Sequence, residues 1–275
     1  MTDTHIVQAY TDAWRQSIES VLELVTPLGE AEWNLPTECP WWSVRDVVSH
    51  LIAMESELLG DPRPIHTLPR DLRHVDDEFS RYCEVPVDKR RCHTAPEMTG
   101  ELEYTILRRA RALRDSRNAP TDEVRWPMGP YTRDIPYYQL LRNRVFDVWT
   151  HEQDLRRALR KPGNLDSAAA LVTRDHLIEL LPKAVAKSAG VPAGTTVFFE
   201  VTGPVEFMRT VRVDENGRGS ADEQISLSPD AEFRTDWETY ARLACGRIDP
   251  RTADVKVEGD EDLATQILQN FSVTP

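Results

Sequence analysis

The hydrophobic pattern of the chain changes at Gly163, and this change limits what the chain can fold into. Before Gly163, apolar residues recur at every third or fourth position in four segments. Such spacing places apolar side chains on one face of an α-helix. After Gly163, short runs rich in Val and Phe are typical of β-strands. The sequence therefore predicts two domains, an all-helical one at residues 1–163 and a small α+β one at residues 164–275.

The four helical segments predict a four-helix bundle. The second of them opens with a capping box, in which Ser43 caps the helix and Asp46 lies in its first turn. The fourth follows Pro136 and ends at Lys161-Pro162-Gly163. The segments are Thr4–Thr26, Ser43–Gly60, Met98–Ser116 and Arg144–Ala158. Metal sites in such bundles are built from side chains of facing helices, so the inward polar residues of these segments are the first place to look for chemistry.

In the second half, strands and helices follow one another. Asn216-Gly217 is a tight-turn signal that joins two strands. The predicted strands are Thr195–Val201, Phe207–Val213, Ile225–Leu227 and Ala253–Val257. The predicted helices are Ala168–Lys187, Asp236–Cys245 and Asp260–Asn270. This part contains neither a phosphate-binding loop nor a dinucleotide fingerprint.

Two connections in the first half are long for a bundle, Asp61–Pro96 and Ala119–Pro136. The first shows little periodicity, and we expect it to carry short helices or to line a substrate entrance. Its histidines are interpreted as surface or loop residues: His66, His74 and His93. The third helix carries apolar residues that we expect to face inward (Leu102, Ile106, Leu107, Ala110, Leu113) and arginines that we expect on its solvated face (Arg108, Arg109, Arg111, Arg114).

Charge and composition exclude several classes of protein. The formal net charge is −13, which repels phosphate backbones and argues against a nucleic-acid partner. The apolar runs are shorter than the roughly 20 residues that span a bilayer, and the N-terminus is polar, so we expect a soluble cytoplasmic protein with no membrane partner. The four cysteines are widely spaced without a C-x-x-C pair, and we expect free thiols: Cys39, Cys83, Cys92 and Cys245.

The fourth helix carries a candidate metal-binding pair. Asp147 and His151 are four residues apart, so their side chains lie one turn apart on the same face. A carboxylate and an imidazole are both ligands of divalent ions. A pair at this spacing is also common as a solvated or hydrogen-bonded pair, and two ligands alone hold a metal poorly.

A third ligand is available on the second helix. His50 lies between Val47 and Met54 on the apolar face, where a histidine needs a polar partner. A backbone carbonyl is the simpler partner, but in a four-helix bundle His50 can also meet Asp147 and His151. Three protein ligands with an open fourth position are typical of a catalytic metal site, whereas a structural zinc site is closed by four.

Three ordered segments resemble a known family. The segment 40–51, PWWSVRDVVSHL, is similar to the P-x-W-[ST]-V-x-D-[LV]-x-x-H-[LI] segment of mycothiol-dependent maleylpyruvate isomerase-like proteins, which begin with a DinB-type four-helix bundle. Residues 147–159, from Asp147 through His151, resemble the second metal segment of that family. The third match is residues 243–247, 257–260 and 273–275, similar to its C-terminal domain.

The resemblance implies a divalent metal, usually zinc, held by His50, Asp147 and His151. The isomerase of this family has Glu where this chain has Asp147, so the ligand oxygen is pulled back by one methylene. Asp154 is the alternative carboxylate, or more simply the residue that orients an imidazole. The resemblance also implies mycothiol, the cysteinyl sugar-inositol of actinobacteria, as thiol cosubstrate. A bound metal would deprotonate that thiol.

The same site would serve two reactions. A mycothiol thiolate that adds to a double bond and leaves would isomerise maleylpyruvate, and one that stays attached would give S-transfer to an electrophilic small molecule. The long connections favour the S-transferase. Two further functions are compatible with the sequence, a metal-activated hydrolase and a non-catalytic binding or regulatory protein. Arg242 and Arg247 are candidates for contacting a carboxylate, and Arg247 is our candidate to clamp the substrate.

Overall fold

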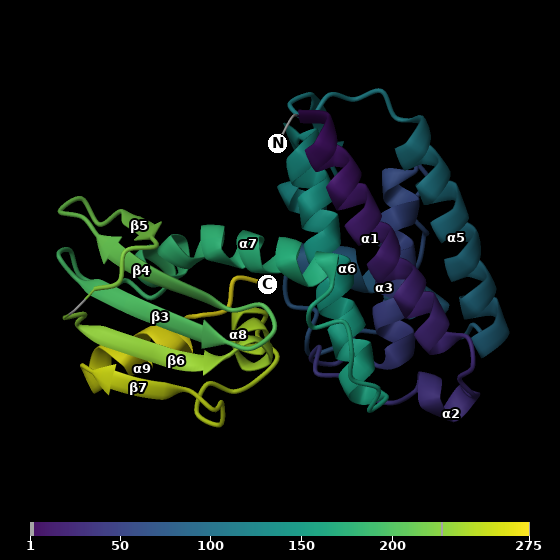
Figure 1. The fold of residues 1–275 in the computed structure, drawn as a ribbon. Helices are drawn as coiled ribbons and strands as arrows, with labels where there is room; N and C mark the ends of the chain where they lie inside the picture. The colour runs from purple at the N-terminus through teal and green to yellow at the C-terminus, as the bar shows by residue number, and fades with distance from the viewer. Residues whose placement is uncertain (1–2, 227, 275) are drawn as a thin grey trace. The chain divides into compact units, whose positions relative to one another are not determined.

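The computed structural model describes residues 3–226 and 228–274, and it divides into two compact units, Met1–Gly163 and Asn164–Pro275 (Figure 1). The first unit is rich in helices and the second contains a five-stranded sheet. The predicted fold class, a helical bundle followed by an α+β part, is thereby confirmed.

Four long helices form the first unit: α1 (Asp3–Val25), α3 (Val44–Leu58), α5 (Ala95–Asp115) and α6 (Tyr137–Ala158). Helix α1 packs along α6, and α3 packs against α5 (Figure 1). The residues with helical spacing face inward, because burying their side chains is the main gain on folding. The fully buried ones include Trp14, Ile18, Leu51, Leu102, Leu141 and Leu155. The capping box is present at α3, where Ser43 Oγ accepts from the Asp46 backbone N–H.

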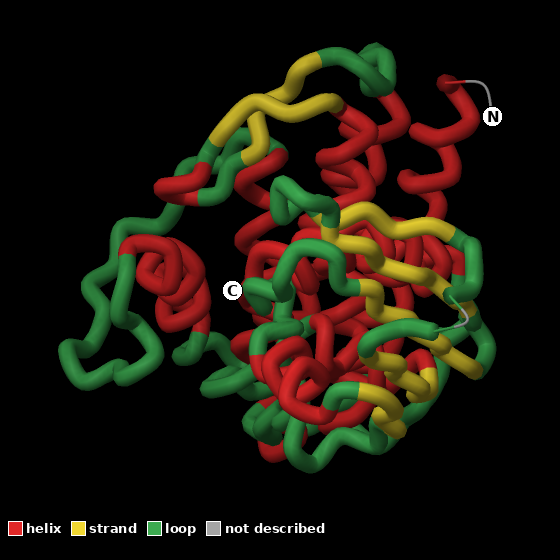
Figure 2. Tube along the Cα trace, turned by 90° about the vertical axis from the view of Figure 1, so that its left-hand side faces the viewer, coloured by secondary structure: helices red, strands yellow, loops and turns green. Residues whose placement is uncertain are grey.

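The two long connections of this unit contain regular structure, which was predicted as short helices for the first connection and was not predicted for the second. The first includes α4 (Glu78–Arg90), which packs against α3 despite Pro86 in its interior. The second folds into an antiparallel hairpin of β1 (Glu123–Trp126) and β2 (Arg133–Pro136), drawn in yellow in Figure 2, around the short helix η1 (Gly129–Tyr131). Helix α2 (Glu30–Trp33) follows α1. The sequence patterns that would indicate α4 and the β1–β2 hairpin are weak, because α4 is mostly polar and the hairpin strands are only four residues long.

Two assignments on the third helix are wrong. Leu107, expected inward, is 65% exposed, and Arg109, expected on the solvated face, is buried. Arg109 faces inward because the facing helix α3 provides a buried carboxylate, Glu55, for its guanidinium (3.1 Å). Helical spacing alone did not reveal this partner.

The second unit is a sheet with the strand order β5-β4-β3-β6-β7 (Figures 1 and 2). The strands are β3 (Thr196–Thr202), β4 (Phe207–Val213), β5 (Gly219–Asp222), β6 (Ala231–Asp236) and β7 (Lys256–Gly259). Strands β3 and β6 are parallel and the other pairs are antiparallel. Helix α7 (Ala168–Lys183), extended by the π-helical turn η2 (Ala184–Ser188), packs on β4 and β5. Helices α8 (Trp237–Ala244) and α9 (Glu261–Gln269) pack on β3, β6 and β7.

The predicted strand Ile225–Leu227 is wrong for Ile225 and Ser226, which lie in a loop, and Leu227 is outside the described residues. The inner strand β6 was missed, because the segment AEFRTD mixes charged and apolar residues. Its backbone pairs on both edges, with β3 and β7, and these hydrogen bonds hold it in the sheet whatever its composition.

Within residues 3–226 and 228–274, no helix combines the length and the apolar character required to cross a bilayer. Each of the four cysteines carries a thiol rather than a disulfide, as predicted.

Candidate metal centre

The structure brings His50 of α3 together with Asp147 and His151 of α6. His50 Nε2 lies 3.4 Å and His151 Nε2 lies 3.8 Å from the same oxygen, Asp147 Oδ1. One donor atom from each of the three residues lies within 4.8 Å of the others. The two imidazole rings meet edge to face, with centroids 4.9 Å apart. The three residues named from the sequence thus form one cluster at the contact between two helices.

The protonation states of His50 and Asp147 suit metal binding. Burial lowers the pKa of His50, which favours the neutral imidazole that a metal ion requires. Burial would raise the pKa of Asp147, but the adjacent Arg144 guanidinium and then His50 outweigh it and hold this pKa well below its usual range. A carboxylate and neutral imidazoles are the ligand forms of a divalent cation such as zinc. By donor chemistry and proximity, the residues fit the implied metal.

A buried ion-pair network holds the carboxylate of Asp147 from behind. Arg144 Nη1 donates to Asp147 Oδ2 (2.9 Å), which leaves Oδ1 turned toward the two histidines. The same guanidinium donates through Nε and Nη2 to Glu55 Oε1 (3.0 and 2.8 Å). Glu55 also accepts from Trp14 and Arg109 (2.9 and 3.1 Å). Partners from all four bundle helices therefore fix the position of one candidate ligand.

Asp154 lies at the other side of the His151 ring. Its Oδ2 is 3.1 Å from His151 Nδ1, and its Oδ1 accepts from Arg157 Nη2 (3.0 Å). Arg157 in turn pairs with Glu38 (2.6 Å). Asp154 is fully buried. A carboxylate in this place orients the imidazole so that Nε2 faces Asp147 and His50, which is the geometry expected of the orienting residue.

The loop before α3 covers the two histidines. The Trp42 ring packs on His50 and on His151, with centroids 5.1 and 6.1 Å away. Its indole N–H donates to Glu84 Oε2 (3.0 Å), and the buried Glu84 pairs with His74 (3.0 Å). The neighbouring Trp41 is 65% exposed and has a φ of +72°, a conformation that costs a bulky residue about 1–3 kcal/mol. The fold holds this loop in place at a cost in backbone strain.

The loop histidines are not simple surface residues. His66 Nε2 lies 2.6 Å from Asp88, His74 pairs with Glu84, and His93 lies 3.6 Å from Glu101. All three are partly buried. All three lie outside helices and strands, as predicted, but their partial burial was not foreseen because their carboxylate partners lie at positions that sequence spacing does not connect.

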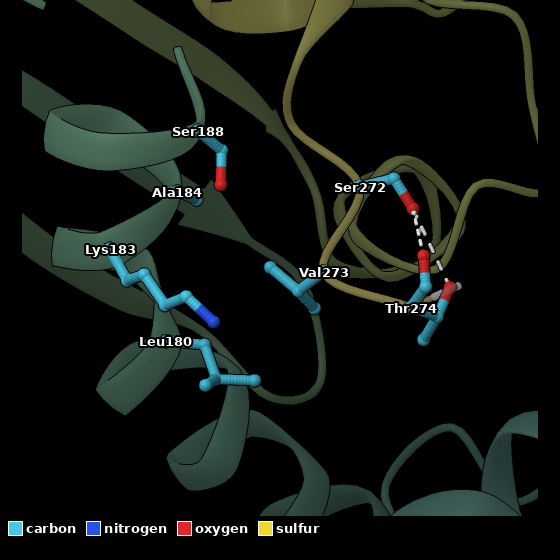
Figure 3. A pocket seen from close by; sticks show the side chains of 7 residues that line it. All are labelled: Leu180, Lys183, Ala184, Ser188, Ser272, Val273 and Thr274. Carbon is cyan, nitrogen blue, oxygen red and sulfur yellow. Dashed lines mark hydrogen bonds between the residues drawn. The ribbon is translucent and has the colours of Figure 1, made fainter. Parts of the chain in front are cut away.

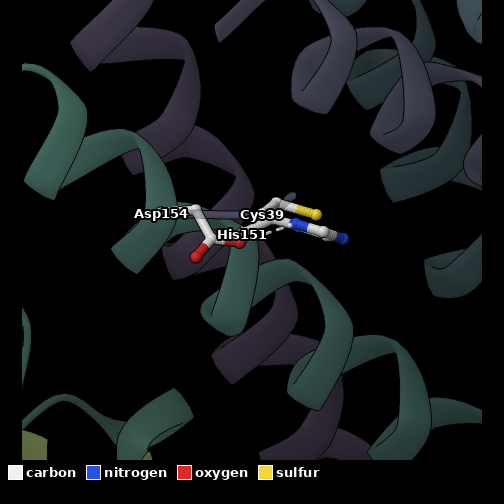
Figure 4. A group of neighbouring side chains, drawn as sticks. All are labelled: Cys39, His151 and Asp154. Carbon is white, nitrogen blue, oxygen red and sulfur yellow. Dashed lines mark hydrogen bonds and ion pairs between the residues drawn. The ribbon is translucent and has the colours of Figure 1, made fainter. Parts of the chain in front are cut away.

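Sequence reasoning also missed Cys39, which lies in the loop before α3 together with Trp42. Figure 4 shows its side chain next to those of His151 and Asp154. Its Sγ, a ring nitrogen of His151 and a carboxylate oxygen of Asp154 all lie within 4.8 Å of one another. The sequence gives no periodic signal for Cys39, because it lies between two prolines in an irregular segment. Glu55 was missed for a different reason: a glutamate next to Met54 is expected to be exposed until its arginine partners are placed.

Arg247 lies in the second unit, just past α8, where its Nη1 donates to the Cys245 carbonyl (2.7 Å). Arg242 is partly buried on α8. The contact of either residue with a substrate carboxylate stays a prediction. A pocket of about 200 Å³ also lies in the second unit (Figure 3), lined by Leu180, Lys183, Ala184, Ser188, Ser272, Val273 and Thr274.

Comparisons with known proteins agree with this layout. The model of the mycothiol maleylpyruvate isomerase N-terminal domain matches residues 14–156, and that of the corresponding C-terminal domain matches residues 168–266. The crystal structure of a mycothiol-dependent maleylpyruvate isomerase is similar, with a TM-score of 0.59, 16% identity, and 94% of this chain and 96% of that chain covered. The crystal structure of a histidine-to-alanine mutant of such an isomerase gives a TM-score of 0.57 at 15% identity, over 90% and 93% of the two chains. No protein with a curated description matches the sequence.

Proposed function

The chain belongs to the mycothiol maleylpyruvate isomerase family, and on this premise we propose that it is a metal-dependent mycothiol S-transferase acting on an electrophilic small molecule. The observation that carries the proposal is the convergence of His50, Asp147 and His151, with one donor from each within 4.8 Å. Zinc is the ion that fits this set best, because two imidazoles and a carboxylate leave one of its four positions for a ligand from solution.

A divalent ion at this place would lower the pKa of a thiol that occupies the open position, and so supply a thiolate at neutral pH. The protein contributes the remaining features. Asp154 fixes the orientation of His151, and Arg144 fixes that of Asp147. The Trp42 ring shields the two imidazoles on one side and limits access of water to them.

The charges around the site favour a neutral electrophile over a diacid. The two guanidiniums that contact the carboxylates of the site are already paired twice each: Arg144 with Glu55 and Asp147, Arg157 with Asp154 and Glu38. A dianionic substrate such as maleylpyruvate would need a further cation, and Arg247 is our candidate. A neutral electrophile needs none. This difference supports S-transfer as the first assignment.

The second candidate is the mycothiol-dependent isomerisation of maleylpyruvate, favoured by the family and by the fold shared with the isomerase structure. The two reactions differ in whether mycothiol is consumed. S-transfer joins the mycothiol sulfur to a carbon of the electrophile and consumes one thiol per product. Isomerisation forms and then breaks the same bond, so the thiol is recovered and the product has the mass of the substrate.

The deciding experiment has two parts. First, bound metal is measured after zinc supplementation in the wild type, in His151→Ala, and in His93→Ala as a matched histidine control from the same unit. We expect about one ion per chain in the wild type and the control, and a large loss in His151→Ala. Second, the loaded protein is incubated with mycothiol and either a neutral electrophile or maleylpyruvate, while free thiol and product mass are followed.

Each result has a defined meaning. Thiol loss with a mass gain equal to mycothiol supports the transferase, and conversion of maleylpyruvate without thiol loss supports the isomerase. A wild type without tightly bound ion contradicts the metal-dependent proposal. In that case, ligand binding that is unchanged in His50→Ala would favour the non-catalytic binding protein.

A further inference from the structure

His151 has a carboxylate at each of its two ring nitrogens. Asp147 Oδ1 lies 3.8 Å from Nε2, and Asp154 Oδ2 lies 3.1 Å from Nδ1. A neutral imidazole has one N–H donor and one nitrogen with a free lone pair. Only Asp154 lies within hydrogen-bonding distance of the ring, so a proton on Nδ1 is donated to Asp154, whereas a proton on Nε2 leaves the lone pair of Nδ1 facing the Asp154 oxygen.

Each edge of the ring has further donors beside it. At the Nε2 edge, His50 completes the set described above. A second set contains Asp154, which faces Nδ1, and the sulfur of Cys39, which lies within 4.8 Å of a ring nitrogen of His151 and of a carboxylate oxygen of Asp154 (Figure 4). The first set offers two nitrogens and one oxygen, and the second offers sulfur, nitrogen and oxygen.

We propose that Cys39, His151 and Asp154 form a second cation position, selective for thiophilic divalent ions, which excludes occupancy of the first. In the first position, Nε2 binds the ion and Nδ1–H donates to Asp154. In the second, Nδ1 binds the ion and Nε2 carries the proton, on the side of the ring that faces Asp147 (3.8 Å). The tautomer of one histidine decides which position is available.

The geometry allows the second position with a small local movement. Donors of a tetrahedral zinc site, with bonds of about 2.0–2.3 Å, stand roughly 3.3–3.8 Å apart. Donors within 4.8 Å of one another therefore need to approach by roughly 1.5 Å or less. Cys39 lies in an irregular loop and is partly buried, so its side chain can adjust without moving a helix.

The choice of ion follows from the sulfur. Thiolate ligands favour soft or borderline ions, whereas an oxygen and nitrogen set discriminates less between the divalent metals. Cadmium and zinc are thus the ions that the second position should hold, and magnesium the ion that it should not. The inference goes beyond the proposed function, because it requires only that both edges of His151 can bind an ion.

The test is a titration of the full-length metal-free protein with cadmium, followed by ultraviolet absorption. Bonding between a thiolate and cadmium gives a charge-transfer band that nitrogen and oxygen ligands do not. We expect this band in the wild type, its loss in Cys39→Ser, and its retention in Cys83→Ser. Cys83 is the matched control because it is also a partly buried thiol of the first unit.

A third variant separates two positions from one. In His50→Ala the first position loses a donor, so the band should persist at similar intensity if Cys39 belongs to a separate position. Its loss in this variant would make Cys39 a fourth ligand of the first position and would overturn the proposal. Equilibrium dialysis should give one cadmium per chain, and two would contradict the exclusive use of His151.

The wild type alone provides a second readout that does not depend on the folding of a variant. The ¹¹³Cd resonance of a sulfur-bound ion lies well downfield of one bound only by nitrogen and oxygen, and we expect the downfield signal. Cadmium bound without the charge-transfer band or the downfield signal overturns the second position. Such a result would leave the His50, Asp147 and His151 site intact.

Discussion

The two units of this protein bury different kinds of side chain. Among the residues that the structure describes, every buried Arg, Asp and Glu lies in the first unit. The buried polar side chains of the second unit are hydroxyl residues and His176. Its core is apolar, aliphatic and aromatic: Phe199 stacks on Phe233 with centroids 5.0 Å apart, and Tyr240 meets Phe271 at 5.5 Å. The comparison shows that folding of the first unit desolvates many charged side chains, which costs free energy. The candidate metal site gives a functional reason for this cost.

The largest effect is expected at the centre of the charged network. Glu55→Ala leaves the guanidiniums of Arg109 and Arg144 buried without this carboxylate, which should destabilise the first unit by about 3–5 kcal/mol. Urea unfolding measures the loss. The same substitution should also weaken metal binding, because Arg144 positions Asp147. A decrease in the free energy of unfolding of less than about 1 kcal/mol would show that the buried charges of the first unit contribute no more to stability than exposed ion pairs do.

The next effect concerns metal affinity without loss of folding. Asp154→Asn keeps the shape of the side chain but removes the charge that orients His151, so the affinity for zinc should fall about 10- to 100-fold. Competition with a chelator measures it. The matched control is His176→Asn, a buried histidine of the second unit, which should leave zinc affinity unchanged. Equal losses in both variants would contradict the role of Asp154.

A smaller effect, confined to the first unit, is expected on its stability at low pH. The folded-state pKa of Asp147 is held below its ordinary value of 3.8, so the unfolded chain takes up this proton first as the pH falls. The stability contributed by Asp147 is therefore fully present well above pH 3.8 and is lost as the pH falls below it. Hydrogen exchange near pH 3.5 should show α3 and α6 opening before the sheet. The reverse order would contradict the comparison.

The smallest effect is expected on the surface of the second unit. Arg234, whose side chain is 46% exposed, pairs with Glu200 and Glu232 (3.0 and 2.6 Å). Arg234→Ala should leave the midpoint of urea unfolding nearly unchanged, because exposed ion pairs are screened by solvent. A cost close to that of Glu55→Ala would mean that exposure does not explain the difference between the units.

The sequence predicted those parts of the fold that depend on periodic burial. The helices α1, α3, α5 and α6 and the strands β3 and β4 were found because their apolar residues repeat with the period of the element. A short helix was expected between Asp61 and Pro96, but the bounds of α4 were not predicted. The β1–β2 hairpin and strand β6 were missed because tertiary partners, rather than their own composition, hold them in place.

The candidate site follows the same division. His50, Asp147 and His151 were found because two of them share a helix face and the third lies on an apolar face. Glu55 and Cys39 were not found, since their relevance depends on distances across the bundle and on the path of an irregular loop. Spacing along one chain cannot supply these distances.

The packing of Trp42 gives the protein an optical probe of its own site. Its indole ring lies against both His50 and His151, and its N–H is held by Glu84. A paramagnetic ion such as cobalt between these imidazoles would quench the emission of this tryptophan far more than that of Trp237, in the core of the other unit. Comparison of the wild type with Trp42→Phe would isolate the signal, so occupancy can be followed in real time without a label.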